Sequence, residues 1–270
     1  MRRGLSRRDF LRTTAAAAAA AGLAHGAPAQ APGLRLGAQS YSFRKFSFED
    51  SIVQLKKLDL SIMEFCSVHF PPEKDHPEFG KVQQTLLEAG VTVPCYGVEG
   101  FGRDKEANRR KFEFAKAFGI EVLTADVEPS AFDDVEALCE EFKVKIAIHN
   151  HGPRARYDKV EDTLKAVAGR TPLIGACVDT GHAIRSAEKP HEVIEALGSR
   201  VISLHLKDWI HGGEEQILGE GEMDLGAVAK ALKALEFNGV AVFEYENEPE
   251  NPVPDMAKGL ANWRAAWDAA

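Results

Sequence analysis

The sequence has no long run of strongly apolar residues and no excess of positive charge. Its alanine-rich stretch, which ends near Ala24, is too short and too weakly hydrophobic to cross about 30 Å of hydrocarbon, a span that takes about twenty apolar residues. The formal net charge is −8, whereas nucleic-acid binding depends on Lys and Arg that neutralise phosphates. We therefore expect no membrane span after removal of the N-terminal segment, and no nucleic-acid partner.

Cysteine and glycine patterns that mark common sites are also missing. The four cysteines, Cys66, Cys95, Cys139 and Cys177, are widely spread without paired spacing, which argues against a disulfide framework or a zinc knuckle and favours buried free thiols. No Gly-x-Gly-x-x-Gly follows the first strand-like run, which disfavours an open dinucleotide-binding sheet. No glycine-rich phosphate loop is evident, so free or glycosidic sugars are favoured over sugar phosphates as ligands.

The N-terminal segment is rich in arginine. It contains Ser6-Arg7-Arg8-Asp9-Phe10-Leu11, followed by the alanine-rich stretch and by the small residues Ala27-Pro28-Ala29. This arrangement resembles a twin-arginine signal peptide. The resemblance implies export of an already folded protein to the periplasm or beyond. We expect residues 1–30 to be the signal peptide and residues 31–270 to be the mature domain.

The mature chain alternates short apolar runs with amphipathic helical patterns, in an ordinary globular composition of 44% hydrophobic and 27% charged residues. The expected strands are Leu34–Ser40, Leu60–Cys66, Val91–Val98, Glu121–Ala125, Lys145–His149, Ile174–Asp179, Val201–His205 and Val240–Glu244. The expected helices are Phe48–Lys57, Glu78–Glu88, Lys105–Phe118, Val135–Phe142, Val160–Ala168, Pro190–Leu197, Leu225–Leu235 and Pro254–Trp267. Eight such units in about 240 residues predict a single-domain α/β protein, a (β/α)8 TIM barrel, in preference to an open doubly wound sheet.

Ionisable residues end four neighbouring strands of this expected barrel. Period-two alternation points His149, Asp179, His205 and Glu244 inward at the carboxyl ends, where barrel enzymes place their chemistry. One buried histidine or one helix-capping aspartate has an ordinary structural explanation, but four such residues in register indicate a metal site. Two imidazoles and two carboxylates suit one divalent ion, with Mn²⁺ preferred and Zn²⁺, Co²⁺, Fe²⁺ or Mg²⁺ as alternatives.

Several motifs resemble the xylose-isomerase-like TIM barrels, a family of sugar isomerases and epimerases, inosose dehydratases and apurinic endonucleases. The matching motifs are Asp179-Thr180-Gly181-His182, His205-Leu206-Lys207-Asp208, Leu218-Gly219-Glu220-Gly221 and Val242-Phe243-Glu244-Tyr245-Glu246. The resemblance implies that Asp179, His205 and Glu244 are three of four metal ligands. The family's fourth ligand is usually a glutamate at the position of His149, so either His149 or His151 takes this role here.

The resemblance also implies roles for neighbouring residues. Glu244 is expected to act as an acid/base as well as a ligand, with His151 and Glu64 as further proton carriers. Lys207 is expected to bind a sugar hydroxyl or to stabilise an enediolate oxygen. Other expected substrate contacts are His182, Glu64, His69, Tyr41, Asp208 and Trp209, with orientation of a ligand histidine as the alternative role of Asp208 and a buried salt bridge as that of Glu64. Arg154 and Arg156 are candidates for binding an acidic sugar such as a uronate.

The sequence thus predicts a metal-dependent isomerase or epimerase of a small carbohydrate or polyol, which removes a proton next to a carbonyl. The alternatives are a 3-keto-glycoside lyase or hydratase, an inosose dehydratase-like lyase, and a non-catalytic sugar-binding barrel. An apurinic endonuclease is disfavoured because the Asp-Arg-His trio that this branch carries is missing before Gly219. The sequence does not reveal the oligomeric state.

Overall fold

The computed structural model describes residues 34–270, so the expected signal peptide, residues 1–30, lies outside the described residues. The strands are β1 (Arg35–Gln39), β2 (Met63–Glu64), β3 (Cys95–Phe101), β4 (Val122–Val127), β5 (Lys145–His149), β6 (Ile174–Asp179), β7 (Val201–Leu206), β8 (Asp208–Trp209), β9 (Glu215–Gln216) and β10 (Val240–Phe243). The α-helices are α2 (Phe48–Lys57), α3 (Phe79–Ala89), α4 (Lys105–Phe118), α5 (Phe132–Phe142), α6 (Val160–Val167), α7 (Thr180–Arg185), α8 (Pro190–Leu197), α9 (Leu225–Ala234) and α10 (Val253–Ala269). Short 3-10 turns occur at Ser40–Phe43, Pro129–Ala131 and Gly198–Arg200.

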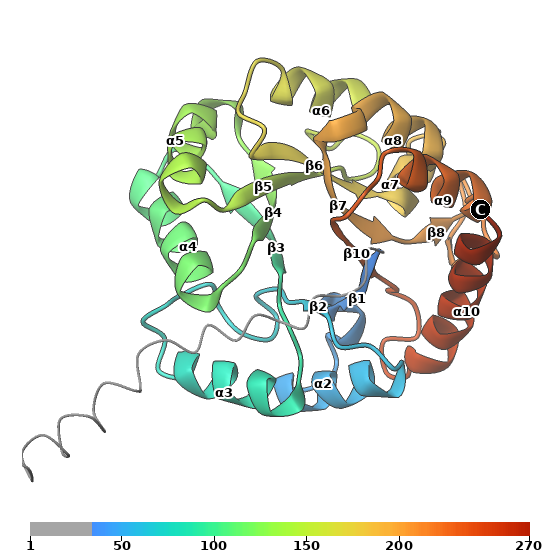
Figure 1. Cartoon of the computed structure of the whole chain (residues 1–270), viewed down its shortest axis with the longest axis horizontal. Coiled ribbons are helices and arrows are strands. Elements are labelled where there is room, and N and C mark those ends of the chain that lie inside the picture. Colours follow the sequence, from blue (N-terminus) through green and yellow to red (C-terminus); the bar gives the residue numbers. More distant parts are fainter. Residues whose placement is uncertain (1–33) are drawn as a thin grey trace, which may run out of the picture. The chain divides into compact units, whose positions relative to one another are not determined.

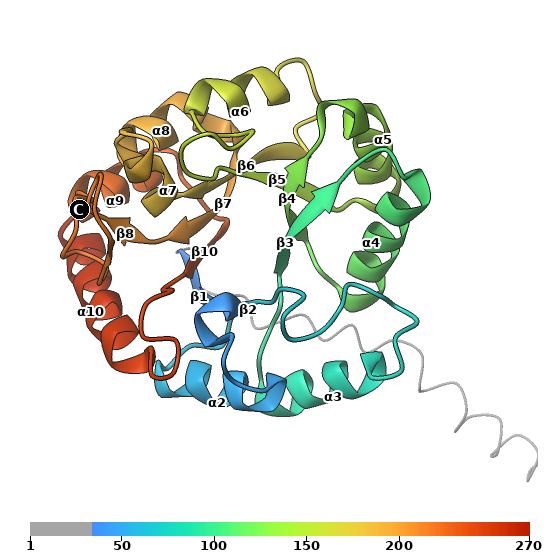
Figure 2. The ribbon, with the colours of Figure 1, turned by 180° about the vertical axis from the view of Figure 1, so that it is seen from behind.

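Eight parallel strands form one nearly closed barrel in the order β2-β1-β10-β7-β6-β5-β4-β3. Isolated parallel bridges, Ile62 with Thr92 and Phe65 with Tyr96, join the two ends of this sheet. The helices surround the strands as an outer ring (Figures 1 and 2). The predicted single-domain (β/α)8 fold is therefore confirmed.

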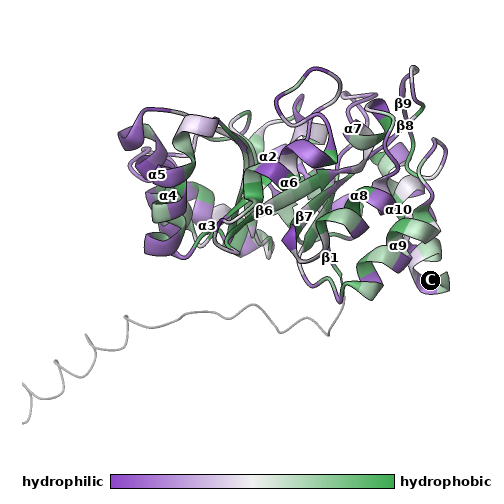
Figure 3. Cartoon of the chain, turned by 90° about the horizontal axis from the view of Figure 1, so that it is seen from above, coloured by the Kyte–Doolittle hydropathy of each residue, from purple (hydrophilic) through white to green (hydrophobic). Residues whose placement is uncertain are grey.

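The helices begin where local capping chemistry predicts. Ser47, Asp104 and Asp224 each accept a hydrogen bond from the backbone N–H three residues ahead, at the starts of α2, α4 and α9. The strands are mostly apolar and are covered by helices whose polar residues lie largely on the outside (Figure 3). Among residues 34–270, no helix combines the length and the apolar character that a membrane crossing requires.

The inside of the barrel is divided into an apolar layer and a polar layer. Small and branched side chains fill the lower layer: Ile62, Cys95, Val122, Ala147, Cys177, Val240 and Val242. Above them, toward the carboxyl ends of the strands, lie His149, Asp179, His205 and Glu244. Ile146 and Ile148 of β5 point into the main core between the barrel and the helices. The predicted alternation in β5 is thus confirmed, and the four cysteines are free and buried, as expected.

Two strands and two connections differ from expectation. The third strand begins at Cys95 rather than Val91, because Pro94 has no N–H to donate; its carbonyl instead accepts bonds from Glu121 and Val122. The second strand is regular only over Met63–Glu64. Helix α7 starts directly after β6, and the β8–β9 hairpin lies between β7 and α9; neither was predicted.

Candidate active site

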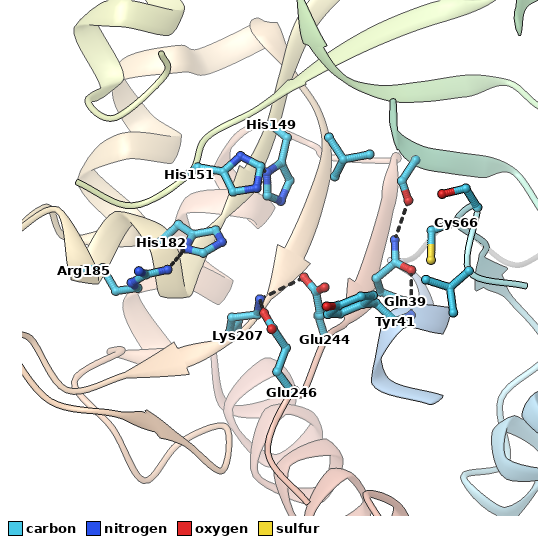
Figure 4. Close-up of a pocket in the computed structure, with 14 residues that line it drawn as sticks. Gln39, Tyr41, Cys66, His149, His151, His182, Arg185, Lys207, Glu244 and Glu246 are labelled. Carbon is cyan, nitrogen blue, oxygen red and sulfur yellow. Dashed lines mark hydrogen bonds and ion pairs between the residues drawn. The ribbon is translucent and has the colours of Figure 1, made fainter. Parts of the chain in front are cut away.

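A cavity of about 400 Å³ opens at the carboxyl ends of the strands. Figure 4 shows His149, His151, His182 and Arg185 on one side of it, with Gln39, Tyr41 and Cys66 on the other. The full lining is Gln39, Tyr41, Cys66, Ser67, Val68, Gly97, Val98, His149, His151, His182, Arg185, Lys207, Glu244 and Glu246. The cavity therefore collects side chains from both ends of the described chain at the end of the barrel that was expected to hold the site.

Four buried side chains form a compact donor cluster in the floor of this cavity. His149, Asp179, His205 and Glu244 each offer one ligand atom, and these atoms lie within 4.8 Å of one another. Asp179 Oδ2 is buried without a hydrogen-bond partner and lies 3.5 Å from His149 Nε2. Lys207 Nζ lies 3.6 Å from the same oxygen, beyond hydrogen-bond distance, so this buried carboxylate oxygen still lacks a close donor or cation. The cluster can hold a metal ion, and its mixed nitrogen and oxygen donors fit a divalent transition metal.

Asn150 fixes the backbone of Asp179. Its side chain accepts a bond of 2.8 Å from the Asp179 N–H and donates one of 2.9 Å to the Asp179 carbonyl. Asp179 Oδ1 meanwhile caps α7 by accepting the His182 N–H at 2.7 Å. One carboxylate oxygen therefore holds the helix, and the other is left for the cluster.

Glu64 lies behind His205 rather than in the cavity. His205 Nε2 lies 3.1 Å from Glu64 Oε2, while its Nδ1 lies 3.1 Å from Glu244 Oε2 and faces the cluster. Glu64 thus forms the buried ion pair that was its alternative role and does not line the pocket mouth, because β2 turns its carboxylate toward the imidazole. A carboxylate on the distal nitrogen orients a ligand histidine and sets its tautomer. Burial lowers the pKa of His205, but Cys177 and Glu64 outweigh burial and raise it.

Lys207 provides the positive charge beside the cluster. Its Nζ lies 3.1 Å from Glu244 Oε2, 3.6 Å from Asp179 Oδ2 and 2.6 Å from Glu246 Oε1. Burial lowers the pKa of Lys207, but the carboxylates of Glu244 and Asp179 outweigh burial and raise it well above its usual range. Burial raises the pKa of Glu244, but Lys207 and His205 outweigh burial, lower this pKa and keep the carboxyl ionised. Glu244 is thus an ionised carboxylate beside a charged lysine.

His151 and His182 line the cavity next to His149. The His149 and His151 Nδ1 atoms are 3.4 Å apart, and the His151 and His182 rings are 5.0 Å apart. Burial, reinforced by His149, lowers the pKa of His151 to about 4. Burial also lowers the pKa of His182 to about 3. Both imidazoles are neutral at pH 7 and offer a donor and an acceptor each.

The remaining predicted contacts divide into one that lines the cavity and three that do not. Tyr41 lines it. Asp208 does not: its carboxylate accepts the backbone N–H groups of residues 209, 219, 221 and 223, so it ties down the following loop and touches no histidine. His69 lies 3.3 Å from the Phe43 carbonyl and faces a separate, smaller cavity. Trp209 lies behind Arg185, with its indole N–H bonded to the Gly213 carbonyl.

Two positively charged residues expected near the substrate also lie elsewhere. Neither Arg154 nor Arg156 lines the cavity, because Arg156 pairs with Asp126 and Arg154 is exposed. Two residues that sequence reasoning missed do line it, Arg185 and Gln39. The signal for Arg185 was its place three residues after His182, which puts both on one face once a helix follows β6.

Comparison with known proteins agrees with this geometry. The family model described as "Xylose isomerase-like TIM barrel" matches residues 52–266, and the model of the twin-arginine translocation signal sequence matches residues 4–24. The chain is 29% identical over 206 residues to the 3-oxo-isoapionate decarboxylase of Pectobacterium atrosepticum, covering 68% of this chain and 72% of the relative. It is 26% identical over 239 residues to the inosose dehydratase of Clostridium botulinum, covering 78% and 79%.

Solved structures show the same fold at lower identity. A D-tagatose 3-epimerase-like protein superimposes with a TM-score of 0.71 and 18% identity, covering 87% of this chain and 98% of that one. The 3-keto-D-glucoside 4-epimerase of E. coli gives a TM-score of 0.68 and 14% identity, covering 86% and 100%. The signal match implies export by the twin-arginine route, as predicted. With a family match over most of the described residues, the chain belongs to the xylose isomerase-like TIM barrel family.

Proposed function

We propose that the protein is a metal-dependent isomerase or epimerase, which removes a proton next to the carbonyl of a small carbohydrate or polyol. The observation that carries the proposal is the buried cluster of four donors, which includes an ionised Glu244 and an Asp179 oxygen without a hydrogen-bond partner, and which lies beside a charged Lys207. Membership of a family that includes sugar epimerases and dehydratases supports it.

One divalent metal ion would be held by His149, Asp179, His205 and Glu244, and Mn²⁺ is our preferred ion. Such an ion supplies Lewis-acid stabilisation of the negative charge that develops on the substrate oxygens. His149 in place of a glutamate makes the site one charge more positive than the usual family site. This change favours transition metals over Mg²⁺.

The protein's own side chains would move the proton. Glu244, ionised at neutral pH, accepts the proton from the carbon next to the carbonyl. Lys207 Nζ, already poised among carboxylates, donates a hydrogen bond to the oxygen on which charge develops. His151 lines the cavity apart from Glu244 (Figure 4) and is the candidate for returning a proton, either to the opposite face of the same substrate carbon or to the neighbouring carbon.

A second candidate is a lyase that uses the same first step. Two specific observations favour it: the sequence relatives are named as a decarboxylase and as inosose dehydratases, and the usual glutamate is replaced by His149. A ligand imidazole has no free site for a proton, so His149 cannot serve as a second carboxylate base. Loss of that base is compatible with elimination, in which a neutral donor such as His182 assists a leaving group.

Deuterium incorporation tests the shared step and separates the two outcomes. The mature Mn²⁺-loaded protein is incubated in D₂O with ketoses, aldoses, inososes and 3-keto-glycosides, and the products are followed by NMR. Deuterium next to the carbonyl in a stereoisomer or positional isomer of the substrate supports an isomerase or epimerase. Deuterium in an unsaturated or shortened product supports the lyase.

The same experiment tests a non-catalytic sugar-binding barrel. That alternative requires no exchange with any class, no stoichiometric metal, and sugar binding that survives Asp179→Ala. This combination of results would contradict the enzyme proposal.

A further inference from the structure

Arg185 occupies a wall of the cavity that the proposed chemistry leaves unused. It ends α7, the helix that Asp179 caps, and lies one turn after His182. Its guanidinium lines the cavity together with His151, His182 and Lys207 (Figure 4). The group is therefore rigidly connected to the floor of the site through a single helical turn.

The guanidinium is held on three sides. Nη1 donates a bond of 2.8 Å to His182 Nδ1, and Cζ lies 4.9 Å from the centre of the Trp209 ring. On the third side lies Gly152, where a Cβ atom would come within 2.9 Å of Cζ. Only glycine leaves room there for this placement. A planar cation stacked on an aromatic ring and fixed by one hydrogen bond keeps its other N–H donors available.

Among residues 34–270, no carboxylate forms an ion pair with Arg185. Lys207 is surrounded by Asp179, Glu244 and Glu246, so its charge is balanced within the protein. Within residues 34–270, the side-chain partners of the Arg185 guanidinium are the His182 imidazole and the Trp209 ring. Because a guanidinium only donates, His182 Nδ1 must accept, which leaves His182 Nε2 as the nitrogen that carries its proton. The remaining N–H groups of Arg185 and the Nε2–H of His182 thus lie side by side without an acceptor among the described residues.

We propose that Arg185, aided by His182, binds the carboxylate of the substrate, so that the substrate is an acidic carbohydrate such as a keturonate. This inference rests on the proposed function and names its substrate class. The planar fork of a guanidinium matches a carboxylate in two parallel hydrogen bonds. A phosphate shares this chemistry, but the described chain offers no glycine-rich loop beside Arg185 to bind one, and its helix α7 starts at Thr180, at the other end of the helix from Arg185. Arg185 here takes the role that sequence reasoning gave to Arg154 and Arg156.

Matched sugar pairs test the assignment. Titration calorimetry measures the affinity of the mature protein, Mn²⁺-loaded and metal-free, for D-fructose, D-fructuronate and D-fructose 6-phosphate, and for D-tagatose and D-tagaturonate. We expect each keturonate to bind about ten- to a hundredfold more tightly than its neutral partner, the range of a charged hydrogen-bond pair. Arg185→Gln should abolish this preference, Arg185→Lys should retain part of it, and the exposed Arg154→Gln should leave it unchanged. Circular dichroism and thermal unfolding establish that each variant is folded.

Three results would overturn the inference: no measurable keturonate binding or no preference for it, a preference that survives Arg185→Gln, or a tighter complex with the sugar phosphate. Deuterium exchange on the neutral ketoses, measured in parallel, keeps this inference separate from the proposed function. Exchange without a carboxylate preference refutes the Arg185 subsite alone. Keturonate binding that depends on Arg185, without exchange in any sugar, refutes the enzyme and retains the subsite.

Discussion

Two sectors of the barrel use buried side chains in opposite ways. The aromatic sector consists of the buried Phe65, Phe70, Tyr96 and Phe114 and the half-buried Phe118, whose neighbouring ring centres lie 5.1 to 6.3 Å apart. The charged sector consists of His149, Asp179, His205, Lys207 and Glu244, all of which are buried. Burial of aromatic rings stabilises a fold, whereas burial of charges costs free energy unless they are paired.

The difference shows which part of the barrel serves as scaffold and which part serves as site. In the charged sector one carboxylate oxygen of Asp179 still lacks a hydrogen-bond partner. A sector that existed only for stability would bury apolar residues at these positions, as the layer below it does. Functional sites are where such local costs are retained. Substitutions in the charged sector should therefore affect mainly chemistry and metal binding, and those in the aromatic sector mainly stability.

The largest effect is expected from Glu244→Gln. It removes the proposed base and a ligand charge while keeping the side-chain volume, so deuterium exchange should fall by about a thousandfold. Glu246→Gln is the matched control, since Glu246 also pairs with Lys207 but lies outside the donor cluster. A smaller loss is expected for this control. Equal losses in the two variants would contradict the role given to Glu244.

In the aromatic sector, Phe114→Ala should lower the free energy of unfolding by about 3–5 kcal/mol, because Phe114 is fully buried and its removal leaves a cavity beside the buried Tyr96 ring. Urea unfolding followed by circular dichroism measures this change. Exchange per folded molecule and bound metal should stay at the wild-type level. If the folded variant lost its metal, the two sectors would not be separable.

The free energy of unfolding should depend on pH through Glu215. Burial raises its pKa from 4.5 to about 7. Its Oε2 accepts the N–H groups of Glu246 and Asn247, which lower this pKa, but burial outweighs them. The folded state therefore holds the proton more tightly than the unfolded state. Its contribution is fully present below pH 4.5 and is lost as the pH rises to about 7, by up to about 3 kcal/mol.

The free energy of unfolding of the wild type relative to Glu215→Gln is expected to fall as the pH rises from 4.5 to 8, because the lowered pKa values of His151 and His182 affect both proteins alike and cancel in this difference. Phe114→Ala should instead lower stability equally at every pH. Urea unfolding at intervals between pH 4.5 and 8 provides the measurement, and a difference that rises over this range would show that the sign assigned to Glu215 is wrong.

A smaller effect is expected at Glu64, which supports His205 from behind. Glu64→Ala should weaken metal affinity by about ten- to a hundredfold, the usual range for a carboxylate on a ligand histidine. Glu64→Gln keeps an acceptor for the imidazole and should weaken affinity less. Competition with a fluorescent chelator gives both values. Unchanged metal affinity in Glu64→Ala would show that Glu64 does not support His205 as a metal ligand.

Much of the fold and the heart of the site were predictable because both depend on local periodicity. Alternation along β5, β6, β7 and β10 decides which side chains face inward, and parallel strands bring their carboxyl ends together. The sequence therefore predicted the cluster that the structure shows, made of His149, Asp179, His205 and Glu244. Their use as metal ligands stays a prediction.

The parts of the site that sequence reasoning missed lie on short or irregular segments, where no periodic pattern of residues predicts the direction of a side chain. Glu64 sits on a strand of only two regular residues, so alternation did not fix which way its carboxylate faces. Asp208 and Arg185 depend on the β8–β9 connection and on α7, whose course is set by tertiary contacts with Gly219, Gly221 and Gly152. Such contacts between distant segments leave no spacing in the sequence.

The most direct test of the account is the metal content of the mature protein, measured by inductively coupled plasma mass spectrometry after dialysis against Mn²⁺ and then metal-free buffer. Asp179→Asn is the informative variant, because an asparagine can still accept the His182 N–H that caps α7. The account predicts one divalent ion per wild-type chain and almost none in folded Asp179→Asn. A wild-type protein without stoichiometric metal, or a variant that retains it, would contradict the metal centre.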